Sequence, residues 1–423
     1  MRSAPRIVAL LAAVPLTALG ADVTRIASSF EPGDPFGMFL DLSFVREQHK
    51  GAIVREIHQA GDVVEVPELR YLMIDSRFDF DLRIGIWQDV EIKYSVPVIL
   101  SQTRTYGFAS GIDAGNSSIT NNCLAPDGTL LDPNCLSTGA GKRAIFDVPN
   151  ASYRGGVGNM HFGLNVALFN EHKDPSKPMW LVGIDYEAPT ATLWDPTVIT
   201  SEVDRGGIGD RIHKYSFFTA FSKRLGVADP YFKFQYTLPF RGPGWYSNCD
   251  HPDAGNMSAP LNCGTGLWTR EETGIHPPHT AGVLFGSEFE LVPSNVQSQR
   301  VALDARIIAN YVSEGRTYNP LTDVLGKLLD TGDHLDFGGA LGITAQASEN
   351  IVLKALTTLL ASTEYTLTQE QVGKDVSGDG KVQLDNPQEL NPNFDWRYDA
   401  VSRRFRMNEA FTFRIDLTAT FSF

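Results

Sequence analysis

The chain has 423 residues, with 36 lysines and arginines against 50 acidic residues and a formal net charge of −14 at pH 7. This length would allow two or three soluble domains, although a single β-barrel can be equally long. The acidic balance argues against nucleic acid as a partner and against binding to anionic lipid head groups through charge.

Residues 1–20 have the pattern of a secretory signal peptide. Arg2 and Arg6 precede an apolar run from Ile7 to Leu19, and small residues surround the end of this run at Gly20. A positive start, a short apolar run and small residues before the cut are the features that a signal peptidase recognises. We therefore expect export and cleavage after Gly20; a buried N-terminal helix is the alternative interpretation.

Beyond this segment, the chain repeatedly alternates apolar and polar residues. Between residues 72 and 86, for example, most residues of one parity are Leu, Ile or Phe, and the other parity is rich in Asp and Arg. Successive side chains of a strand point to opposite faces, so each such segment predicts a strand with one apolar face. We expect twelve of these strands, at residues 36–47, 69–86, 90–103, 157–169, 179–189, 211–224, 231–241, 281–292, 300–313, 336–346, 350–364 and 408–423. A hairpin hidden in a long loop would bring the number to fourteen.

The last predicted strand bears on the choice between two architectures. From Phe411 to Phe423 every second residue is apolar and the residues between them are polar. A soluble sandwich would bury the apolar face, whereas a barrel in lipid turns it outward and lines its lumen with the polar face. The ending with Phe421 and Phe423 resembles the signal that delivers bacterial barrel proteins to the barrel assembly machinery, which favours the barrel.

The lengths of the predicted connections also favour the barrel. Short connections at 87–89, 170–178, 225–230, 293–299 and 347–349 alternate with long ones at 48–68, 104–156, 190–210, 242–280, 314–335 and 365–407. Short periplasmic turns, long external loops and an even number of strands are typical of outer-membrane barrels. The predicted fold class is therefore all-β, a transmembrane antiparallel up-and-down β-barrel of the bacterial outer membrane. Its predicted parts are the signal peptide (1–20), an N-terminal periplasmic segment (21–35) and the barrel (36–423).

Two motifs resemble those of a known family. Residues 156–160, Gly-Val-Gly-Asn-Met, open a strand, and residues 79–97 form a strand–turn–strand unit that ends in Val96-Pro97. Both resemble outer-membrane β-barrel transporters associated with the meta-pathway of phenol degradation. That family usually has Asp where this chain has Asn159, and it lacks the long cysteine-bearing loops. The resemblance covers residues 70–240 and the final strand, and it implies passive uptake of small, often hydrophobic molecules.

The four cysteines fall into two local pairs, Cys123 with Cys135 and Cys249 with Cys263, both in predicted long loops. In the oxidising compartment that an exported protein reaches, such pairs predict disulfides that close the tips of loops. A zinc site, which needs four convergent ligands, is the alternative.

Charged residues on the polar parity of the strands are predicted to line the lumen. An Arg or Lys that faced the middle of the bilayer would cost about 2–4 kcal/mol. The expected lumen-lining residues are Asp75, Arg77, Asp79, Asp81, Arg83, Glu91, Lys93, Asp185, Glu187, Lys233, Glu288, Glu290, Asp304, Arg306, Arg414 and Asp416. They would either create a field that selects ions or neutralise one another across strands and partly fill a narrow barrel.

Residues 375–382, Asp-Val-Ser-Gly-Asp-Gly-Lys-Val, resemble the first half of a calcium-binding loop. Asp375, Ser377 and Asp379 place oxygen atoms at alternate positions, and a glycine stands sixth. The twelfth position is Asn386 and cannot supply the usual bidentate carboxylate. The alternatives are a structural calcium ion in an external loop and an Asp/Gly-rich turn without metal. We expect no other cofactor.

The sequence favours a conduit over an enzyme, because it has no GxSxG, HExxH or phosphate-binding glycine motif in a suitable context. We expect a porin-like channel for passive passage of small solutes, hydrophobic ones included. The alternative is a non-conducting barrel whose disulfide-stapled loops bind a partner, as a component of envelope machinery or an adhesin; a lipid hydrolase at the outer rim comes third. Expected partners are outer-membrane lipid, the barrel assembly machinery, small solutes and lipopolysaccharide. The basic segment 401–406 could contact the phosphates of lipopolysaccharide; the more ordinary interpretation of this segment is a solvated strand rim.

Overall fold

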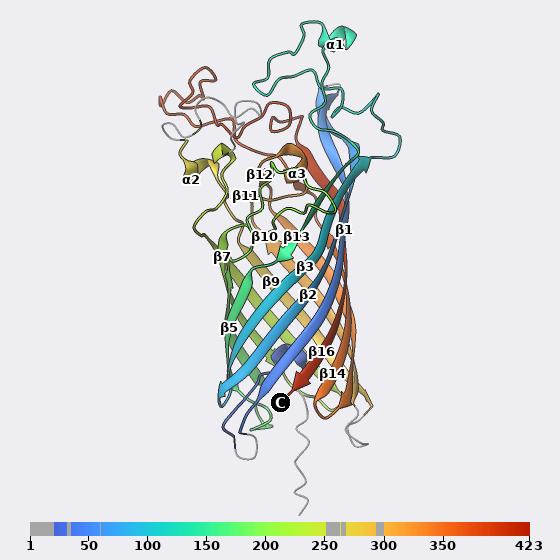
Figure 1. Cartoon of the computed structure of the whole chain (residues 1–423), viewed down its shortest axis with the longest axis vertical. Helices are drawn as coiled ribbons and strands as arrows, with labels where there is room; N and C mark the ends of the chain where they lie inside the picture. Colours follow the sequence, from blue (N-terminus) through green and yellow to red (C-terminus); the bar gives the residue numbers. More distant parts are fainter. Residues whose placement is uncertain (1–20, 32–34, 60, 251–262, 264–267, 293–299) are drawn as a thin grey trace, which may run out of the picture.

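In a computed structural model, residues 21–31, 35–59, 61–250, 263, 268–292 and 300–423 are described, and the predicted signal peptide lies outside them. Within this part, twelve antiparallel strands form a barrel that is closed by pairing of the first strand with the last (Figure 1). The wall strands are β1 (Met38–Gln59), β2 (Asp62–Trp87), β3 (Val90–Phe108), β5 (Met160–Phe169), β6 (Met179–Ala188), β7 (Ile212–Ser222), β8 (Ala228–Arg241), β9 (Thr280–Val292), β10 (Val301–Val312), β13 (His334–Ser348), β14 (Ile351–Ser362) and β16 (Phe405–Ser422). The predicted fold class is confirmed, with twelve strands in the wall.

The remaining elements are short. Two extend the wall, β4 (Asn150–Val157) beside β3 and β15 (Tyr365–Thr366) beside β16. The others are η1 (Asp22–Thr24), α1 (Cys135–Thr138), η2 (Asn248–Asp250), α2 (Arg270–Thr273), α3 (Thr322–Leu325), and the pair β11 (Gly315–Thr317) and β12 (Leu329–Thr331). In the described part of the chain, no helix is both long and apolar enough to cross a membrane.

The outer face of the wall carries the apolar parity of each strand. Phe44 on β1 pairs with Phe78 on β2 and with Leu417 on β16, so apolar side chains lie next to each other around the outside. Phe285, Ile307 and Leu341 are 60%, 69% and 64% exposed. Side chains of this kind would be buried in a soluble protein, whereas on a closed barrel they form the band that meets lipid.

An aromatic group on the outer face marks the region near the long loops. The Tyr186 hydroxyl lies 2.6 Å from Nδ1 of His213, and the Tyr186 ring stacks on that of Tyr215 with centroids 4.8 Å apart. Girdles of aromatic residues lie at the membrane–water interfaces of outer-membrane barrels. The long loops gather at this end of the barrel, and the short turns and the C-terminus lie at the other (Figure 1).

The prediction of a loop at residues 48–68 is wrong, because β1 and β2 continue through it as a hairpin that pairs as far as Gln59 with Asp62. Beyond a bulge between Lys50 and Ala52, the strands leave the lipid-facing band. Ile53 and Leu69 are there fully buried against loops. The alternation of apolar and polar residues therefore stops here, although the two strands remain paired. The sequence shows where the alternation ends, but it does not show that the pairing continues.

Candidate functional site

The predicted lumen-lining residues lie on the wall face opposite to the exposed apolar side chains. Asp75, Glu91, Glu288 and Asp304 are at most 4% exposed, although their strand neighbours on the other parity face outward. A buried carboxylate needs a partner, since an unpaired charge in such a place costs several kcal/mol. The wall supplies these partners from its own strands.

Most of the pairs are local. Arg77 contacts Asp75 at 3.5 Å and Asp79 at 3.2 Å, and Lys93 lies 3.5 Å from Asp81 on the neighbouring strand. Further pairs among the predicted set and its neighbours are Arg83 with Asp41, Lys214 with Glu187, Arg224 with Glu290, Arg300 with Glu288 and Glu290, Arg306 with Asp304, and Arg414 with Asp416. Lys233 lies over the Phe218 ring, 4.5 Å from its centroid. Asp185 lines the same cavity as Lys233, and Asn159 of the family-like motif donates to Glu187 at 2.7 Å. The charges are thus largely compensated within the wall.

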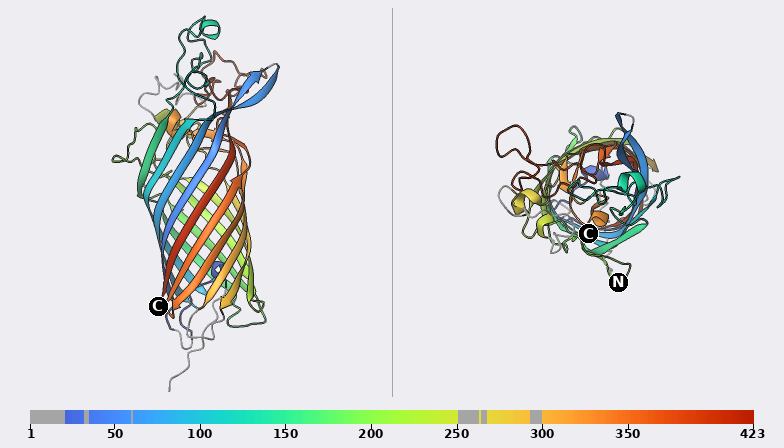
Figure 2. Two further views of the ribbon diagram at one scale, coloured as in Figure 1. Left: turned by 90° about the vertical axis from the view of Figure 1, so that its right-hand side faces the viewer. Right: turned by 90° about the horizontal axis from the view of Figure 1, so that it is seen from above.

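Residues 21–29, here called the inner plug, lie inside the barrel at the end with the short turns (Figure 2). They belong to the segment that the sequence analysis expects in the periplasm. Backbone N–H groups of Ala21 and Ala27 donate to Asp229 at 2.7 Å and to Glu91 at 2.6 Å. Lys354 forms an ion pair with Asp22. The plug is therefore tied to β8, β3 and β14, which lie on different sides of the barrel.

Apolar contacts of the inner plug are few. Val23 and Ile26 pack against a small cluster on the inner wall that includes Leu181 and Phe218. Above the plug lies a cavity of about 280 Å³ with a mainly polar lining. Five acidic and five basic side chains border it, namely Asp22, Asp41, Asp81, Glu91, Asp185, Arg25, Arg83, Lys93, Lys233 and Lys354.

The other end of the lumen is occupied by residues 313–333, here called the outer plug, which contain β11, α3 and β12 (Figure 1). Asp323 of α3 accepts hydrogen bonds from the Ser152 hydroxyl at 2.6 Å and from Nε1 of Trp194 at 3.0 Å. It also pairs with Arg154 at 2.5 Å and Arg104 at 3.7 Å. Burial alone would raise the pKa of the Asp323 carboxyl, but Arg104 and Arg154 outweigh it and hold the pKa below its usual value.

The two arginines are themselves fixed. Both guanidinium groups lie over the Trp194 ring, Arg104 at 4.1 Å and Arg154 at 4.3 Å from its centroid. Cation–π contacts of desolvated guanidinium groups stabilise by about 2 kcal/mol. Asp323, Arg104, Arg154 and Trp194 thus form one buried unit, called the latch below, which joins the outer plug to β3, β4 and the loop after β6.

A hydrophobic cluster surrounds the outer plug. It consists of buried residues from the β1–β2 hairpin, β3, β15, β16, two loops and the plug, and is called the cap cluster. Its members are Ile53, Leu69, Tyr71, Tyr106, Ile119, Phe146, Leu321, Leu325, Leu329, Tyr365, Leu367, Tyr398, Phe405, Met407 and Ala410. Burying a large apolar side chain contributes about 1.5–3 kcal/mol, so this cluster holds the loops firmly together.

The latch could not be predicted from the sequence, for a structural reason. A register shift lies between Ile99 and Gln102 of β3, where β4 takes over the pairing. A bulge of this kind changes which parity faces inward, so the alternation before it does not predict that Arg104 is buried. Asp323 stands in a loop with no local pattern that marks it, and only its position in the fold brings it to the arginines.

The structure contains both predicted disulfides, Cys123–Cys135 and Cys249–Cys263, in loops at the end opposite to the short turns. The calcium question remains a prediction. Both oxygens of Asp375 accept backbone N–H groups of its own loop, from Gly378 at 2.6 Å and Gly380 at 2.8 Å. Asp379 likewise accepts from the Lys381 N–H at 2.9 Å. Within the described residues, no group of three or more His, Cys, Asp or Glu side chains is arranged to hold a metal ion.

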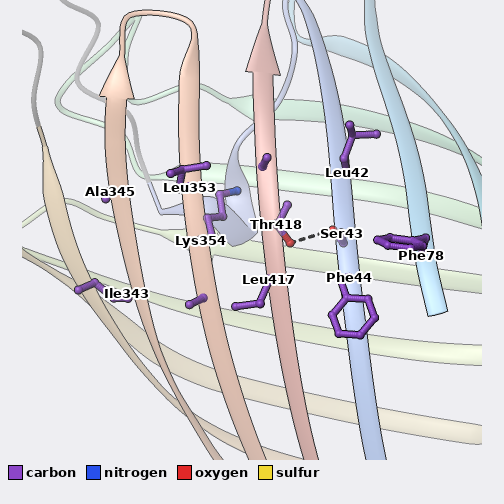
Figure 3. Close-up of a pocket in the computed structure, with 12 residues that line it drawn as sticks. Leu42, Ser43, Phe44, Phe78, Ile343, Ala345, Leu353, Lys354, Leu417 and Thr418 are labelled. Atoms are coloured by element: carbon purple, nitrogen blue, oxygen red, sulfur yellow. Dashed lines mark hydrogen bonds between the residues drawn. The ribbon is translucent and has the colours of Figure 1, made fainter. Parts of the chain in front are cut away.

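An apolar groove of about 470 Å³ lies where β13, β14, β16 and β1 adjoin (Figure 3). Small residues, Ala345, Ala355 and Ala419, leave room there between larger ones such as Leu353 and Leu417. Because these apolar residues belong to the lipid-facing parity, we expect lipid acyl chains to occupy the groove. Behind it the wall is intact: Ser43 and Thr418 are hydrogen-bonded at 2.8 Å, as Figure 3 shows.

A closed barrel with an apolar exterior and a charged inner face is the architecture of a bacterial outer-membrane protein. The chain is a multi-pass β-barrel of the outer membrane. No protein-family model matches this chain, and no curated protein matches it either.

Three solved structures illustrate the similarity of fold. An outer membrane channel from Pseudomonas putida is 12% identical, with 93% of this chain and 99% of that chain covered and a TM-score of 0.43. A FadL homologue from Pseudomonas aeruginosa is 8% identical, with 91% and 90% covered and a TM-score of 0.36. The outer membrane protease OmpT from Escherichia coli is 8% identical, with 92% and 98% covered and a TM-score of 0.28. Channels and a protease are thus both among the barrels that this chain is similar to in fold.

Proposed function

We propose that this protein is an outer-membrane channel for the passive passage of small solutes, closed in the present state by the inner and outer plugs. The observation that carries the proposal is the polar cavity of about 280 Å³ within the lumen, bordered by compensated charges. Neither closure is a strand of the wall: both are segments held by hydrogen bonds, ion pairs and apolar contacts, so they can leave without breaking the pairing of the wall strands.

The side chains that line the cavity indicate which kind of solute could pass. Five carboxylates and five cationic groups surround the cavity, with Leu181 and Phe218 on one side. Such a lining favours small solutes that carry polar or charged groups of both signs together with some apolar surface, since each group of the solute can replace a partner in the wall. The family resemblance implies small, often hydrophobic molecules, but a purely hydrophobic solute would leave these charges unsatisfied during passage.

The test is single-channel conductance of the refolded chain, starting at Ala21, in planar bilayers. We expect rare or small openings for the intact chain and frequent, larger openings once residues 21–29 are deleted and Asp323 is replaced by Ala. A matched control keeps both plugs and carries Asp379→Ala in an exposed loop, and should conduct like the intact chain. Absence of openings in the doubly opened variant, with the barrel still folded by gel mobility, would overturn the proposal.

The second candidate is a non-conducting barrel whose stapled loops bind a partner. The observation that favours it is the cap cluster, in which residues of the loops 109–149, 313–333 and 363–404 pack together. Removing residues 124–134 together with Cys123 and Cys135 separates the two functions. A channel should keep its conductance in this variant, whereas a binding scaffold should lose its partner.

A further inference from the structure

The N-terminal end of the inner plug lies in an unusual environment. Ala21 is fully buried, and its nitrogen donates to Oδ2 of Asp229 at 2.7 Å. Asp229 is the second residue of the wall strand β8 and is only 4% exposed. Its second oxygen, Oδ1, is buried and has no hydrogen-bond partner among the described residues. The carboxylate of Asp229 could accept several hydrogen bonds, but among the described residues it receives one from Ala21 and none at Oδ1.

Among the described residues, the charges around Asp229 also fall short by one cation. Glu171 acts on Asp229 too but pairs with Lys223. Three further acidic side chains lie together here, Asp229, Glu288 and Glu290, and two arginines serve them. Arg224 pairs with Glu290, and Arg300 lies 3.7 Å from Glu288 and 3.6 Å from Glu290. Glu288 also accepts the Asp22 N–H at 2.6 Å. A buried carboxylate without a cationic partner costs free energy, so one more positive group would stabilise this part of the lumen.

Hydrolysis of the Gly20–Ala21 peptide bond would supply that group. Water adds across the bond, Gly20 leaves with a carboxylate, and the nitrogen of Ala21 becomes an α-ammonium with three hydrogens and a positive charge. The same nitrogen at the same place could then donate to both Oδ1 and Oδ2 of Asp229. Hydrogen bonds between charged partners are about twice as strong as neutral ones.

We propose that Ala21 is the N-terminal residue of the mature protein and that Asp229 is the wall receptor for its α-ammonium. Processing during export thereby completes the docking of the inner plug, and a chain cut at another bond would not place its ammonium at Asp229. Neighbouring contacts hold Ala21 in position: the Thr24 hydroxyl donates to the Ala21 carbonyl at 3.1 Å and lies 2.8 Å from the Ser222 hydroxyl.

Two measurements test this inference, and neither depends on conduction, so they stand apart from the channel proposal. The first is the intact mass of protein purified from outer membranes after expression of the full chain. We expect the mass of a chain that starts at Ala21. A different first residue would overturn the inference.

The second measurement is the rate at which an amine-reactive acylating reagent modifies the N-terminus of the folded barrel, followed on the N-terminal peptide. Asp229→Asn keeps the shape but removes the charge, and should speed labelling roughly tenfold to a hundredfold, as expected for loss of a charge-assisted hydrogen bond. Asp75→Asn, an equally buried wall carboxylate that pairs with Arg77, is the matched control and should leave the rate unchanged.

A further variant keeps Asp229 and inserts one glycine directly before Ala21, which moves the ammonium by about 3.8 Å along the chain. Its N-terminus should label as fast as that of Asp229→Asn. If Asp229→Asn fails to fold, this variant still tests whether the N-terminal ammonium binds Asp229. Equal labelling rates for the wild-type chain and the glycine-extended chain would contradict the role of Asp229.

Discussion

The two plugs close opposite ends of the same lumen by different means. The inner plug is held mainly by polar contacts, such as those of Ala21 with Asp229 and Ala27 with Glu91, and only Val23 and Ile26 pack on an apolar cluster. The outer plug contributes Leu321, Leu325 and Leu329 to the cap cluster and is joined to the wall by the buried latch.

This difference has an energetic consequence. Water can replace the partners of a polar contact, so each hydrogen bond contributes a net stabilisation of only about 0.5–1.5 kcal/mol. Burial of three leucines contributes about 1.5–3 kcal/mol for each side chain. We therefore expect the inner plug to open first and the outer plug to open only when its latch is released.

The largest expected effect comes from breaking the latch with Asp323→Ala. Arg154 is 1% exposed and Arg104 7% exposed, and removal of their common carboxylate leaves both charges unpaired. Removing one partner from a buried ion pair costs about 3–5 kcal/mol. Trypsin should then cut the folded protein after Arg316 or Lys327.

The control for this experiment is Asp379→Ala, in the exposed part of the loop after β15. Its carboxylate contacts only its own loop, through Lys381 and Gln383. Similar rates of cleavage in the two variants would mean that the outer plug does not depend on the latch.

A smaller effect is expected from pH. Burial raises the pKa of the Asp399 carboxyl to about 8, because nearby Glu370 adds to the effect and Lys327 only partly offsets it. A pKa above the unfolded value of 3.8 means that the folded loops bind the proton more tightly than the unfolded chain does. The stabilisation is complete below about pH 4, falls as the pH rises, and is lost above about pH 8.

Protection of the loop 365–404 from proteolysis should accordingly decrease between pH 6 and pH 9, while the inner plug is unaffected. Asp399→Asn should remove most of this dependence, and Asp127→Asn, on an exposed turn of another external loop, should not. Undiminished protection at pH 9 in the wild-type chain would argue that Asp399 is ionised throughout this range.

The smallest effect is expected from reduction of the disulfides. Cys123–Cys135 closes a segment with a sequence separation of 12 residues, and a bond of this kind stabilises by about 2–4 kcal/mol. Its loss should make residues 124–134 sensitive to protease but leave the melting of the barrel and the labelling of Ala21 unchanged. A drop in the melting temperature of the whole barrel on reduction would show that the loops and the wall unfold together.

Several parts of the fold could be predicted from sequence because their rules are local. The strands expected at 90–103 and 179–189 are found as Val90–Phe108 and Met179–Ala188. A strand that faces lipid needs an apolar side chain at every second position, and this alternation is visible in the sequence of each strand by itself. The pairing of the cysteines could be predicted for a similar reason, because the two cysteines of each pair lie within a single loop.

The alternation does not predict the contacts between segments that lie far apart in the chain. Asp229 meets Ala21 across 208 residues, and Asp323 meets Arg154 across 169. Neither aspartate differs from an ordinary loop or strand-end aspartate in its local sequence. The sequence by itself determined a lipid-facing band and a polar interior, because each strand meets the membrane separately. Only closure of the barrel decided which segments fill its two ends and which charges they find there, because these partners come together only when the first strand pairs with the last.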